Sequence, residues 1–276
     1  MRTPSTLDFF EIDVFATGPF SGNPLAVVAG AEGLSTEQMQ RIAAWTNFSE
    51  TTFLLPPQSP EADYRVRIFS PVEEYLFAGH PTLGTARAWL ELGGTPASSG
   101  RVVQECGVGN VEVRIDGDSL AFATPPLKRS GELSAREVSE ICEAFGIEQH
   151  ELIDASVGDN GPGWKLALLS SVDKLRALTH PKVPGLKVAF AALAGGDDPA
   201  YELRAFTPTF EDPVTGSANG AMAQWRRSRG DVPAKYSVSQ GRSVGREGRV
   251  VIVDDGRDIW VGGRAEVRVA GRMLVE

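Results

Sequence analysis

Apolar and polar residues alternate with two different periods along the chain, and the two periods predict a mixture of helices and strands. Apolar residues recur at intervals of three and four in 34–45 and 133–145, the spacing of one face of an α-helix. Each segment opens with the pattern of a capping box, which begins at Ser35 in the first and at Ser134 in the second. We therefore expect two helices that each pack one apolar stripe against another surface.

Strict alternation of apolar and polar residues predicts strands in much of the remaining sequence. The alternating segments lie at 65–69 and 202–206, and longer ones lie at 102–115 and 248–263. The two longer segments predict β-hairpins that turn at Gly109-Asn110 and at Asp255-Gly256, because such dipeptides adopt the turns that join antiparallel strands. The chain therefore reads as mixed α and β throughout.

The second half of the chain repeats part of the first half. Residues 64–86 align with 201–223 without a gap and share the seven identities given below. Two unrelated segments of this length would share about one or two at average composition. The identical pairs are Tyr64/Tyr201, Arg67/Arg204, Phe69/Phe206, Pro71/Pro208, Glu74/Glu211, Gly79/Gly216 and Ala86/Ala223. The capped helices at 34–45 and 133–145 form a second echo at a shorter offset, which indicates different loop lengths in two similar halves.

A glycine opens a small, apolar segment in each half, and these segments at 81–92 and 218–229 predict enclosed helices. The first N–H groups of a helix have no intrahelical partner, so the turns at Gly79 and Gly216 can bind an anion, either a carboxylate or a phosphate. The first turn resembles a phosphate-binding loop that lacks its lysine. A simple tight turn from strand to helix is the other interpretation, and the repetition favours a binding function.

Composition excludes several classes of protein. The formal net charge is −9 and the basic residues are dispersed, so nucleic acid is not an expected partner. No apolar run is long enough for a membrane span, and the N-terminus lacks the pattern of a secretory signal, so we expect a soluble, cytoplasmic protein. Cys106 and Cys142 are the two cysteines, and the histidines are scattered, which argues against a disulfide framework or a metal site.

Five segments together resemble the phenazine biosynthesis PhzF-like family over nearly the whole chain. They are "DVFATGPFSGNPLAVV" (13–28), "NFSETTFLL" (47–55), "FAGHPTLGTA" (77–86), "EDPVTGSANG" (211–220) and "SQGRSVGREG" (239–248). The resemblance implies an α+β fold of the diaminopimelate epimerase type, with two pseudo-symmetric domains that each roll a mostly antiparallel sheet around a central helix. It places the active site in the cleft between the domains.

The same resemblance implies where the domains divide. The N-terminal half covers residues 1–117 and is rejoined by the last strand, at about 264–276. The C-terminal half covers 118–263. A chain of 276 residues has the length expected for two domains of roughly 140 residues each.

Epimerases and racemases of this superfold carry one cysteine at each helix start and use the two thiols as acid and base. Here His80 and Ser217 hold those positions, which excludes a two-thiol racemase. In the PhzF-like family the glutamate of the "NxSET" block moves the proton, and that residue is Glu50. Its neighbours Phe48 and Phe53 predict a partly apolar surrounding that raises the pKa of Glu50 towards neutrality. Without the resemblance, Glu50 would be taken for an exposed residue at a strand start.

The family pattern assigns the remaining site residues. His80 and Asp212 contact polar or ammonium groups of the substrate and assist the proton transfer, so Glu50, His80 and Asp212 are the predicted catalytic residues. Ser217, with the backbones of Gly79 and Gly216, is predicted to bind the substrate carboxylate. Asp212 also fits a simpler role as a turn residue before a proline.

The predicted function is a cofactor-independent, metal-independent isomerase of the PhzF type. The family's prototype moves a proton from C3 to C1 of trans-2,3-dihydro-3-hydroxyanthranilate, and we expect that compound or a related small carboxylic acid as substrate. Two alternatives are a non-catalytic small-molecule binding protein and an epimerase or racemase of another amino-acid-like substrate. The resemblance also implies a homodimer, with no nucleic acid or membrane partner.

Overall fold

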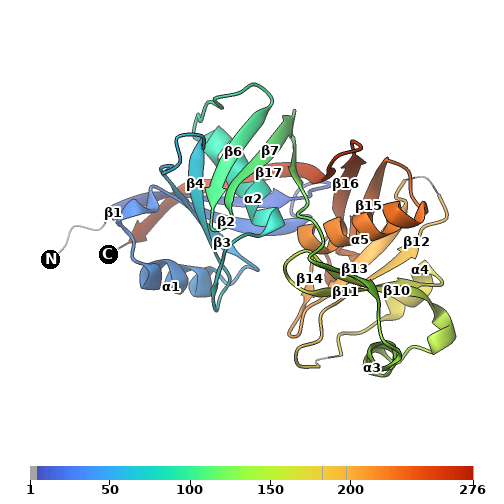
Figure 1. Ribbon diagram of the computed structural model, residues 1–276. Coiled ribbons are helices and arrows are strands. Elements are labelled where there is room, and N and C mark those ends of the chain that lie inside the picture. Colours follow the sequence, from blue (N-terminus) through green and yellow to red (C-terminus); the bar gives the residue numbers. More distant parts are fainter. Residues whose placement is uncertain (1–4, 182, 197, 276) are drawn as a thin grey trace. The chain divides into compact units, whose positions relative to one another are not determined.

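The computed structural model describes residues 5–181, 183–196 and 198–275, and the chain forms two compact units (Figure 1). Unit 1 comprises Met1–Phe122 together with Gly262–Glu276, and unit 2 comprises Ala123–Val261. The chain therefore leaves unit 1 once and returns to it through its last strand.

Unit 1 is a mixed sheet that closes on itself. Its strands are hydrogen-bonded in the order β17-β1-β2-β3-β4-β6-β7-β8, and β8 pairs back to β17. The pairs β2–β3 and β4–β6 are parallel, and a helix makes the crossover in each. The strands are β1 (Ser5–Val14), β2 (Asn23–Ala29), β3 (Thr51–Leu55), β4 (Tyr64–Phe69), β5 (Glu74–Tyr75), β6 (Arg101–Cys106), β7 (Gly109–Asp116), β8 (Ser119–Ala123) and β17 (Ile259–Val275).

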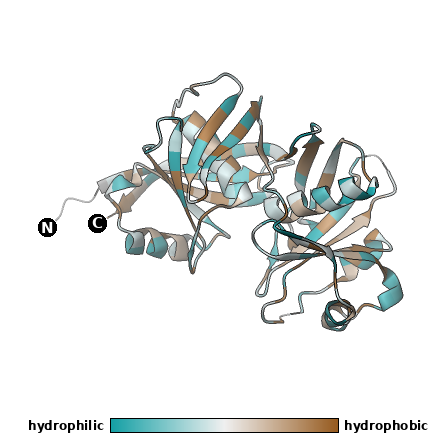
Figure 2. Cartoon of the chain, viewed as in Figure 1, coloured by the Kyte–Doolittle hydropathy of each residue, from teal (hydrophilic) through white to brown (hydrophobic). Residues whose placement is uncertain are grey.

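Two helices complete unit 1, and they differ in how far they are buried. Helix α1 (Thr36–Thr46) joins β2 to β3 and lies on the sheet with one apolar face, over a core that includes Met39 and Phe53. Helix α2 (Gly79–Glu91) follows the short strand β5 and is buried along its first eight residues. The alternating apolar positions of the surrounding strands are visible as brown bands in Figure 2. The prediction of an enclosed helix after Gly79 is thus confirmed.

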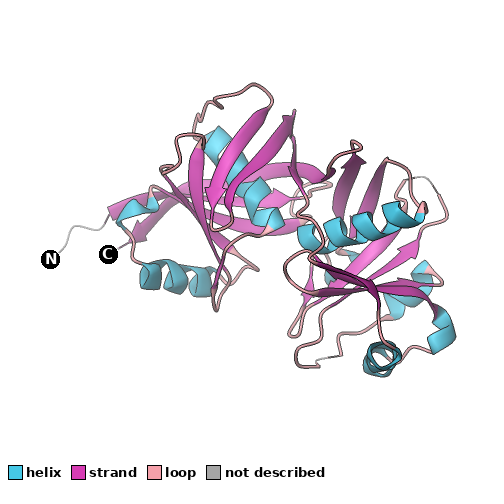
Figure 3. Ribbon diagram, viewed as in Figure 1, coloured by secondary structure: helices cyan, strands magenta, loops and turns pink. Residues whose placement is uncertain are grey.

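From β10 to β16, unit 2 repeats the order of elements of unit 1 around helix α5 (Gly216–Arg229), and it too surrounds a helix with strands (Figure 3). Its strands pair in the order β9-β10-β11-β12-β13-β15-β16, with β11–β12 and β13–β15 parallel. The strands are β9 (Arg129–Glu132), β10 (Leu152–Asp159), β11 (Trp164–Leu169), β12 (Val188–Leu193), β13 (Tyr201–Phe206), β14 (Glu211–Asp212), β15 (Lys235–Gln240) and β16 (Gly248–Asp254). The other helices are α3 (Ala135–Phe145), α4 (Val172–Ala177) and the short 3₁₀ turns η1 (Ala31–Gly33), η2 (Gln149–Glu151) and η3 (Arg242–Val244).

The internal repeat extends to individual contacts. Strands β4 and β13, strands β5 and β14, and helices α2 and α5 each start at positions that the repeat aligns. An arginine on β4 or β13 pairs with a glutamate on β5 or β14 in both units, as Arg67–Glu74 and Arg204–Glu211, each with an N–O distance of 2.6 Å. The predicted α+β fold of two similar halves is therefore confirmed.

Two details of the sequence prediction are wrong. Both capping boxes are present, but α1 joins β2 to β3, and the helix in that place in unit 2 is α4, not α3. Helix α3 instead precedes β10, so the echo at 133–145 reflects a common way to begin a helix and not the repeat. The first hairpin turns at Gly107-Val108, because Cys106 pairs with Gly109 across the strands.

Gly84, the second glycine of the phosphate-loop resemblance, has a packing role. A Cβ atom at this position would lie 2.4 Å from Leu25 Cδ2 and 3.0 Å from Val14 Cγ2. Such distances are too short for a side-chain carbon, so only glycine lets α2 approach β1 and β2 this closely. In the described part of the chain, no helix is long and apolar enough to cross a membrane.

The two equivalent ion pairs differ in burial, and we expect them to differ in their contribution to stability. The side chains of Arg204 and Glu211 are 5% and 8% exposed, and Arg204 Nη1 also donates to three carbonyl oxygens, those of residues 175, 176 and 178. Arg204→Gln should lower the free energy of unfolding by about 3–5 kcal/mol, because it leaves Glu211 buried and unpaired.

The matched substitution in unit 1 is Arg67→Gln. Arg67 and Glu74 are 26% and 37% exposed, so this variant should lose about 1 kcal/mol or less. Urea unfolding of both variants measures the difference. Equal losses at the two positions would contradict the assignment of a structural role to the buried pair.

Candidate active site

Glu50 and His80, two of the predicted catalytic residues, lie together in unit 1. Glu50 occupies the segment between α1 and β3, after Asn47 ends the helix in a left-handed conformation (φ 57°). His80 is the second residue of α2. Its Nδ1 atom is 3.4 Å from Glu50 Oε2, and the side chains of His80 and Glu50 are 5% and 15% exposed. The fold thus brings a carboxyl group to the start of a buried helix.

Strand β3 presents opposite faces to the two helices of unit 1. Thr52 lies on the face towards α2, because its hydroxyl accepts a hydrogen bond from Thr85 at 2.9 Å. Glu50 directly precedes β3, and its carboxyl group reaches His80 on α2. Phe53 lies on the other face, in the core beneath α1. The partly apolar surrounding expected of Glu50 from Phe48 and Phe53 stays a prediction.

His80 is a neutral residue at physiological pH. Burial lowers the pKa of the His80 imidazole from 6.5 to about 3, and the carbonyl oxygen of Pro24 opposes that shift only in part. The start of a helix also disfavours a positive charge, because the helix dipole is positive at that end. The contact between His80 and Glu50 consequently joins a carboxyl group to a neutral imidazole and is not an ion pair.

Ser217, the residue equivalent to His80 in the repeat, is the second residue of α5 in unit 2. Its Oγ atom accepts a hydrogen bond from Trp164 Nε1 at 3.0 Å, and its carbonyl oxygen accepts one from Asn160 Nδ2 at 2.9 Å. Trp164 is 3% exposed and Asn160 is 5% exposed. Neither residue was recognised in the sequence, because each is distant from Ser217 along the chain and carries no motif of its own.

Asp212 lies on β14 and is fixed to the turn before α5. Its Oδ2 atom accepts a hydrogen bond from Thr215 Oγ1 at 2.7 Å, and its carbonyl oxygen accepts one from Gln240 Nε2 at 3.1 Å. Gln240 in turn accepts from the Thr215 N–H at 3.1 Å and from Asn219 Nδ2 at 2.7 Å. The buried Gln240, which lies in the family-like segment "SQGR", therefore holds the turn in place, a role that the sequence had not indicated.

The two helix starts offer different numbers of free donors. The first intrahelical hydrogen bonds are donated by the N–H groups of Thr82 in α2 and Asn219 in α5. In the part of the chain that the structure describes, the N–H groups of residues 216, 217 and 218 at the start of α5 have no acceptor. Helix α2 has one donor fewer, because its third residue, Pro81, has no N–H. The start of α5 is thus the better anion site.

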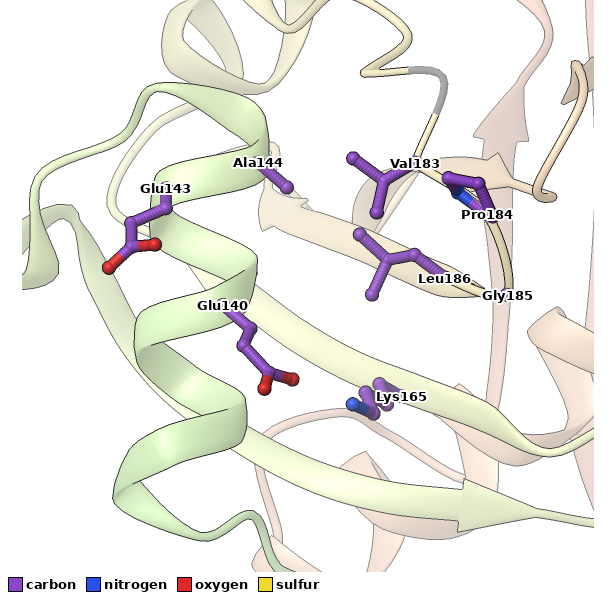
Figure 4. A pocket seen from close by; sticks show the side chains of 8 residues that line it. All are labelled: Glu140, Glu143, Ala144, Lys165, Val183, Pro184, Gly185 and Leu186. Carbon is purple, nitrogen blue, oxygen red and sulfur yellow. The ribbon is translucent and has the colours of Figure 1, made fainter.

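A separate hollow of about 520 Å³ lies in unit 2, away from the start of α5 (Figure 4). It is lined by Glu140, Glu143 and Ala144 of α3, Lys165 of β11 and residues 183–186. None of the predicted site residues lines it. Among the described residues, no three His, Cys, Asp or Glu side chains lie together as a metal-binding set.

The architecture of two repeated units, each with a helix start that carries polar residues, defines an α+β protein of the diaminopimelate epimerase type. A PhzF-family protein of Bacillus anthracis has a similar structure, with a TM-score of 0.84 and 24% identity over 98% of this chain and 100% of that one. A hydroxyproline epimerase from Agrobacterium vitis matches with a TM-score of 0.60 and 16% identity, covering 99% and 94% of the two chains. Both likenesses show the fold.

The family follows from the sequence. The family model described as phenazine biosynthesis-like protein, PhzC-PhzF, matches residues 12–274, and the chain belongs to this family. A trans-2,3-dihydro-3-hydroxyanthranilate isomerase of Pseudomonas aeruginosa is 36% identical over 88% of each chain. Antisense-enhancing sequence 1 of Schizosaccharomyces pombe is 34% identical over 97% of this chain and 98% of its own. The protein is an enzyme of the isomerase class.

The neutral state of His80 predicts a distinct dependence of stability on pH. The folded-state pKa lies below the unfolded one, so as pH falls from about 6.5 towards 3 the unfolded chain takes up a proton that the folded chain does not. The free energy of unfolding should therefore fall more steeply in the wild type than in His80→Gln, by about 1.4 kcal/mol per pH unit. Urea unfolding at several pH values measures the two slopes, and parallel curves would show that folded His80 is protonated.

Proposed function

We propose that this isomerase moves a proton within a small carboxylic acid, trans-2,3-dihydro-3-hydroxyanthranilate or a related compound, without a cofactor. The observation that carries the proposal is the buried contact between Glu50 and His80 at the start of α2. The name of the Pseudomonas aeruginosa relative supports the choice of substrate class. In this proposal Glu50 acts as the general acid and base.

The proposed reaction requires one carboxyl group to remove a proton from the substrate and then to return it at another carbon. The Glu50 carboxylate removes the proton from C3, the C–H electron pair enters the conjugated system, and the protonated carboxyl group then delivers the proton to C1. The resulting enol becomes a ketone by a further proton shift. A carboxyl group suits both steps because it is basic enough to accept the proton and acidic enough to give it back.

A neutral His80 fits this cycle better than a charged one. A neutral imidazole contacts Glu50 without fixing the carboxyl group in its ionised form. An imidazolium would instead hold the carboxylate in its charged form and oppose the uptake of a proton. We therefore assign His80 to the support of proton transfer and not to the neutralisation of the substrate carboxylate.

The substrate carboxylate belongs, in this proposal, at the start of α5. Three N–H groups without acceptors in the described part of the chain and the Ser217 hydroxyl are available there, and the helix dipole favours a negative charge. The Gly216 and Ser217 backbones supply the donors in this proposal. Asp212, next to this start, is proposed to hold an ammonium or hydroxyl group of the same substrate.

The proposed isomerase can be compared with a thiol-based epimerase, because epimerases share this fold. Cys106 lies on β6 and Cys142 on α3, so neither thiol lies at the start of α2 or α5. Burial also raises the pKa of both thiols, which leaves less of the reactive thiolate at neutral pH. No observation favours an epimerase over the isomerase.

We also propose that the enzyme acts in the cytoplasm as a homodimer. Its two free cysteines suit a reducing compartment, and the family resemblance suggests the dimer. Light scattering after size-exclusion chromatography should give twice the mass of the 276-residue chain. A monomer at micromolar concentration would contradict the dimer without affecting the proposed reaction.

The proposed role of Glu50 predicts a large loss of activity in Glu50→Gln. The wild type should convert trans-2,3-dihydro-3-hydroxyanthranilate to product in D₂O. NMR follows the conversion, and deuterium enters at C1 to the extent that the Glu50 proton exchanges with solvent before it is returned. Glu50→Gln should be slower by a factor of about 10²–10⁴, the usual effect of removing a general acid–base group.

Glu91→Gln is the matched control, since Glu91 lies at the exposed end of α2 with a side chain 44% exposed. It should keep the wild-type rate. Equal rates in Glu50→Gln and the wild type would contradict the mechanism, whereas no turnover of this compound by the wild type would contradict the substrate.

A further inference from the structure

His80 and Ser217, the two equivalent helix residues of the repeat, are each contacted from the start of an equivalent strand, β2 in unit 1 and β11 in unit 2. In unit 1 Ala26 of β2 pairs with Thr51, and in unit 2 Lys165 of β11 pairs with Val188. Thr51 and Val188 are separated by the same offset as the aligned pairs of the repeat. The residues before these pairing positions, 24–25 in β2 and 163–164 in β11, are therefore equivalent.

The contacting groups come from neighbouring positions, since Pro24 aligns with Gly163 and Trp164 aligns with Leu25, and they have opposite polarity. In unit 1 the carbonyl oxygen of Pro24, an acceptor, faces His80. In unit 2 the indole N–H of Trp164, a donor, is 3.0 Å from Ser217 Oγ. The starts of the two equivalent strands thus supply an acceptor to the imidazole and a donor to the hydroxyl group.

The donor from Trp164 determines what Ser217 can do. An indole nitrogen has a hydrogen and no lone pair available for a hydrogen bond, so Ser217 Oγ must be the acceptor of this contact. The hydroxyl hydrogen must then point away from Trp164, and it has no acceptor in the described part of the chain. A carboxylate oxygen would satisfy it with a charge-assisted hydrogen bond.

The surroundings keep this arrangement fixed. Trp164 is 3% exposed at the start of β11, so the indole ring has no freedom to turn into solvent. Asn160 holds the Ser217 carbonyl oxygen at 2.9 Å, and its Nδ2 atom also lies 3.3 Å from Thr124 Oγ1. A Cβ at Gly220 would come within 2.2 Å of Thr124 Oγ1, so the first turns of α5 fit closely against these residues.

We infer that Trp164 is a positioning residue that makes the Ser217 hydroxyl group an obligate hydrogen-bond donor to the substrate carboxylate. The inference rests on the proposed function, in which that carboxylate binds at the start of α5. It also explains how the start of α5 would select among ligands: a ligand group that presents only hydrogen-bond acceptors is favoured at Ser217. A carboxamide should bind less well than the matching carboxylate, because its NH₂ group would face donors.

Trp164→Phe tests the inference, because it keeps an aromatic ring and removes the Nε1 hydrogen. The KM for the substrate should rise about 3- to 10-fold, the effect of losing one ordinary hydrogen bond, with kcat within twofold of the wild type. Trp260→Phe is the matched control, since Trp260 is 4% exposed and its Nε1 donates to Asp255 Oδ2 at 2.9 Å. It should leave KM unchanged.

A double-mutant cycle separates a role through Ser217 from a general effect on packing. If Trp164 acts through Ser217, then Trp164→Phe in the Ser217→Ala background should raise KM no further. Additive losses in the double variant would overturn the inference.

A binding measurement gives a readout that does not depend on turnover. With anthranilate as the probe, the indole N–H resonance of Trp164 should shift in a ¹H–¹⁵N spectrum of the wild type and stay fixed in Ser217→Ala. The resonance is assigned by its loss in Trp164→Phe, and the Trp260 resonance serves as the internal reference. Anthranilamide should bind at least about 10-fold more weakly than anthranilate, since a charge-assisted hydrogen bond is lost.

The outcomes distinguish the inference from the proposed function. A Trp164 resonance that does not respond to anthranilate, or that responds equally in Ser217→Ala, would overturn the positioning role. A resonance that responds as expected, together with full activity of Glu50→Gln, would instead contradict the proton-transfer mechanism and leave the positioning role in place.

Discussion

The first residues of each central helix are buried, although the first N–H groups of a helix have no intrahelical partner. The other features of the site depend on this constraint. Buried glutamine side chains fix the first turn of each helix without using these N–H groups. Gln104 bonds to Thr82 in α2, and Gln240 bonds to Asn219 in α5, at positions that the repeat aligns in the two helices. The N–H donors are left for a ligand, which is why a protein with no phosphate-binding lysine still has the start of an anion site.

The repeat supplies the same frame twice, but the side chains make the two helix starts chemically different. In α2 a proline removes one donor, and the buried, neutral His80 faces Glu50. In α5 all the donors remain, and Trp164 directs the Ser217 hydroxyl group. Burial therefore keeps the polar group of one helix start neutral, and hydrogen-bond polarity leaves the hydroxyl group of the other as a donor.

The sequence predicted the features that depend on local pattern. The capping boxes, the strand alternation and the internal repeat are all visible without tertiary contacts, and the repeat located both helix starts at Gly79 and Gly216. Glu50 and His80 came from the family resemblance, and the structure brings them within 3.4 Å. The roles assigned to these residues, and to Asp212 and Ser217, stay predictions.

Features that depend on strand parity and register were missed. Phe53 lies three residues after Glu50 in the sequence, but its side chain packs in the core beneath α1, on the face of β3 opposite to Thr52. Trp164 and Gln240 reach α5 from strands that are distant in sequence, so only the pairing of those strands reveals them.

The central claim concerns which helix start binds the substrate carboxylate. A crystal structure with anthranilate bound should place its carboxylate within hydrogen-bond distance of Ser217 Oγ and the first N–H groups of α5. A carboxylate bound at Glu50 and His80 instead would contradict the account.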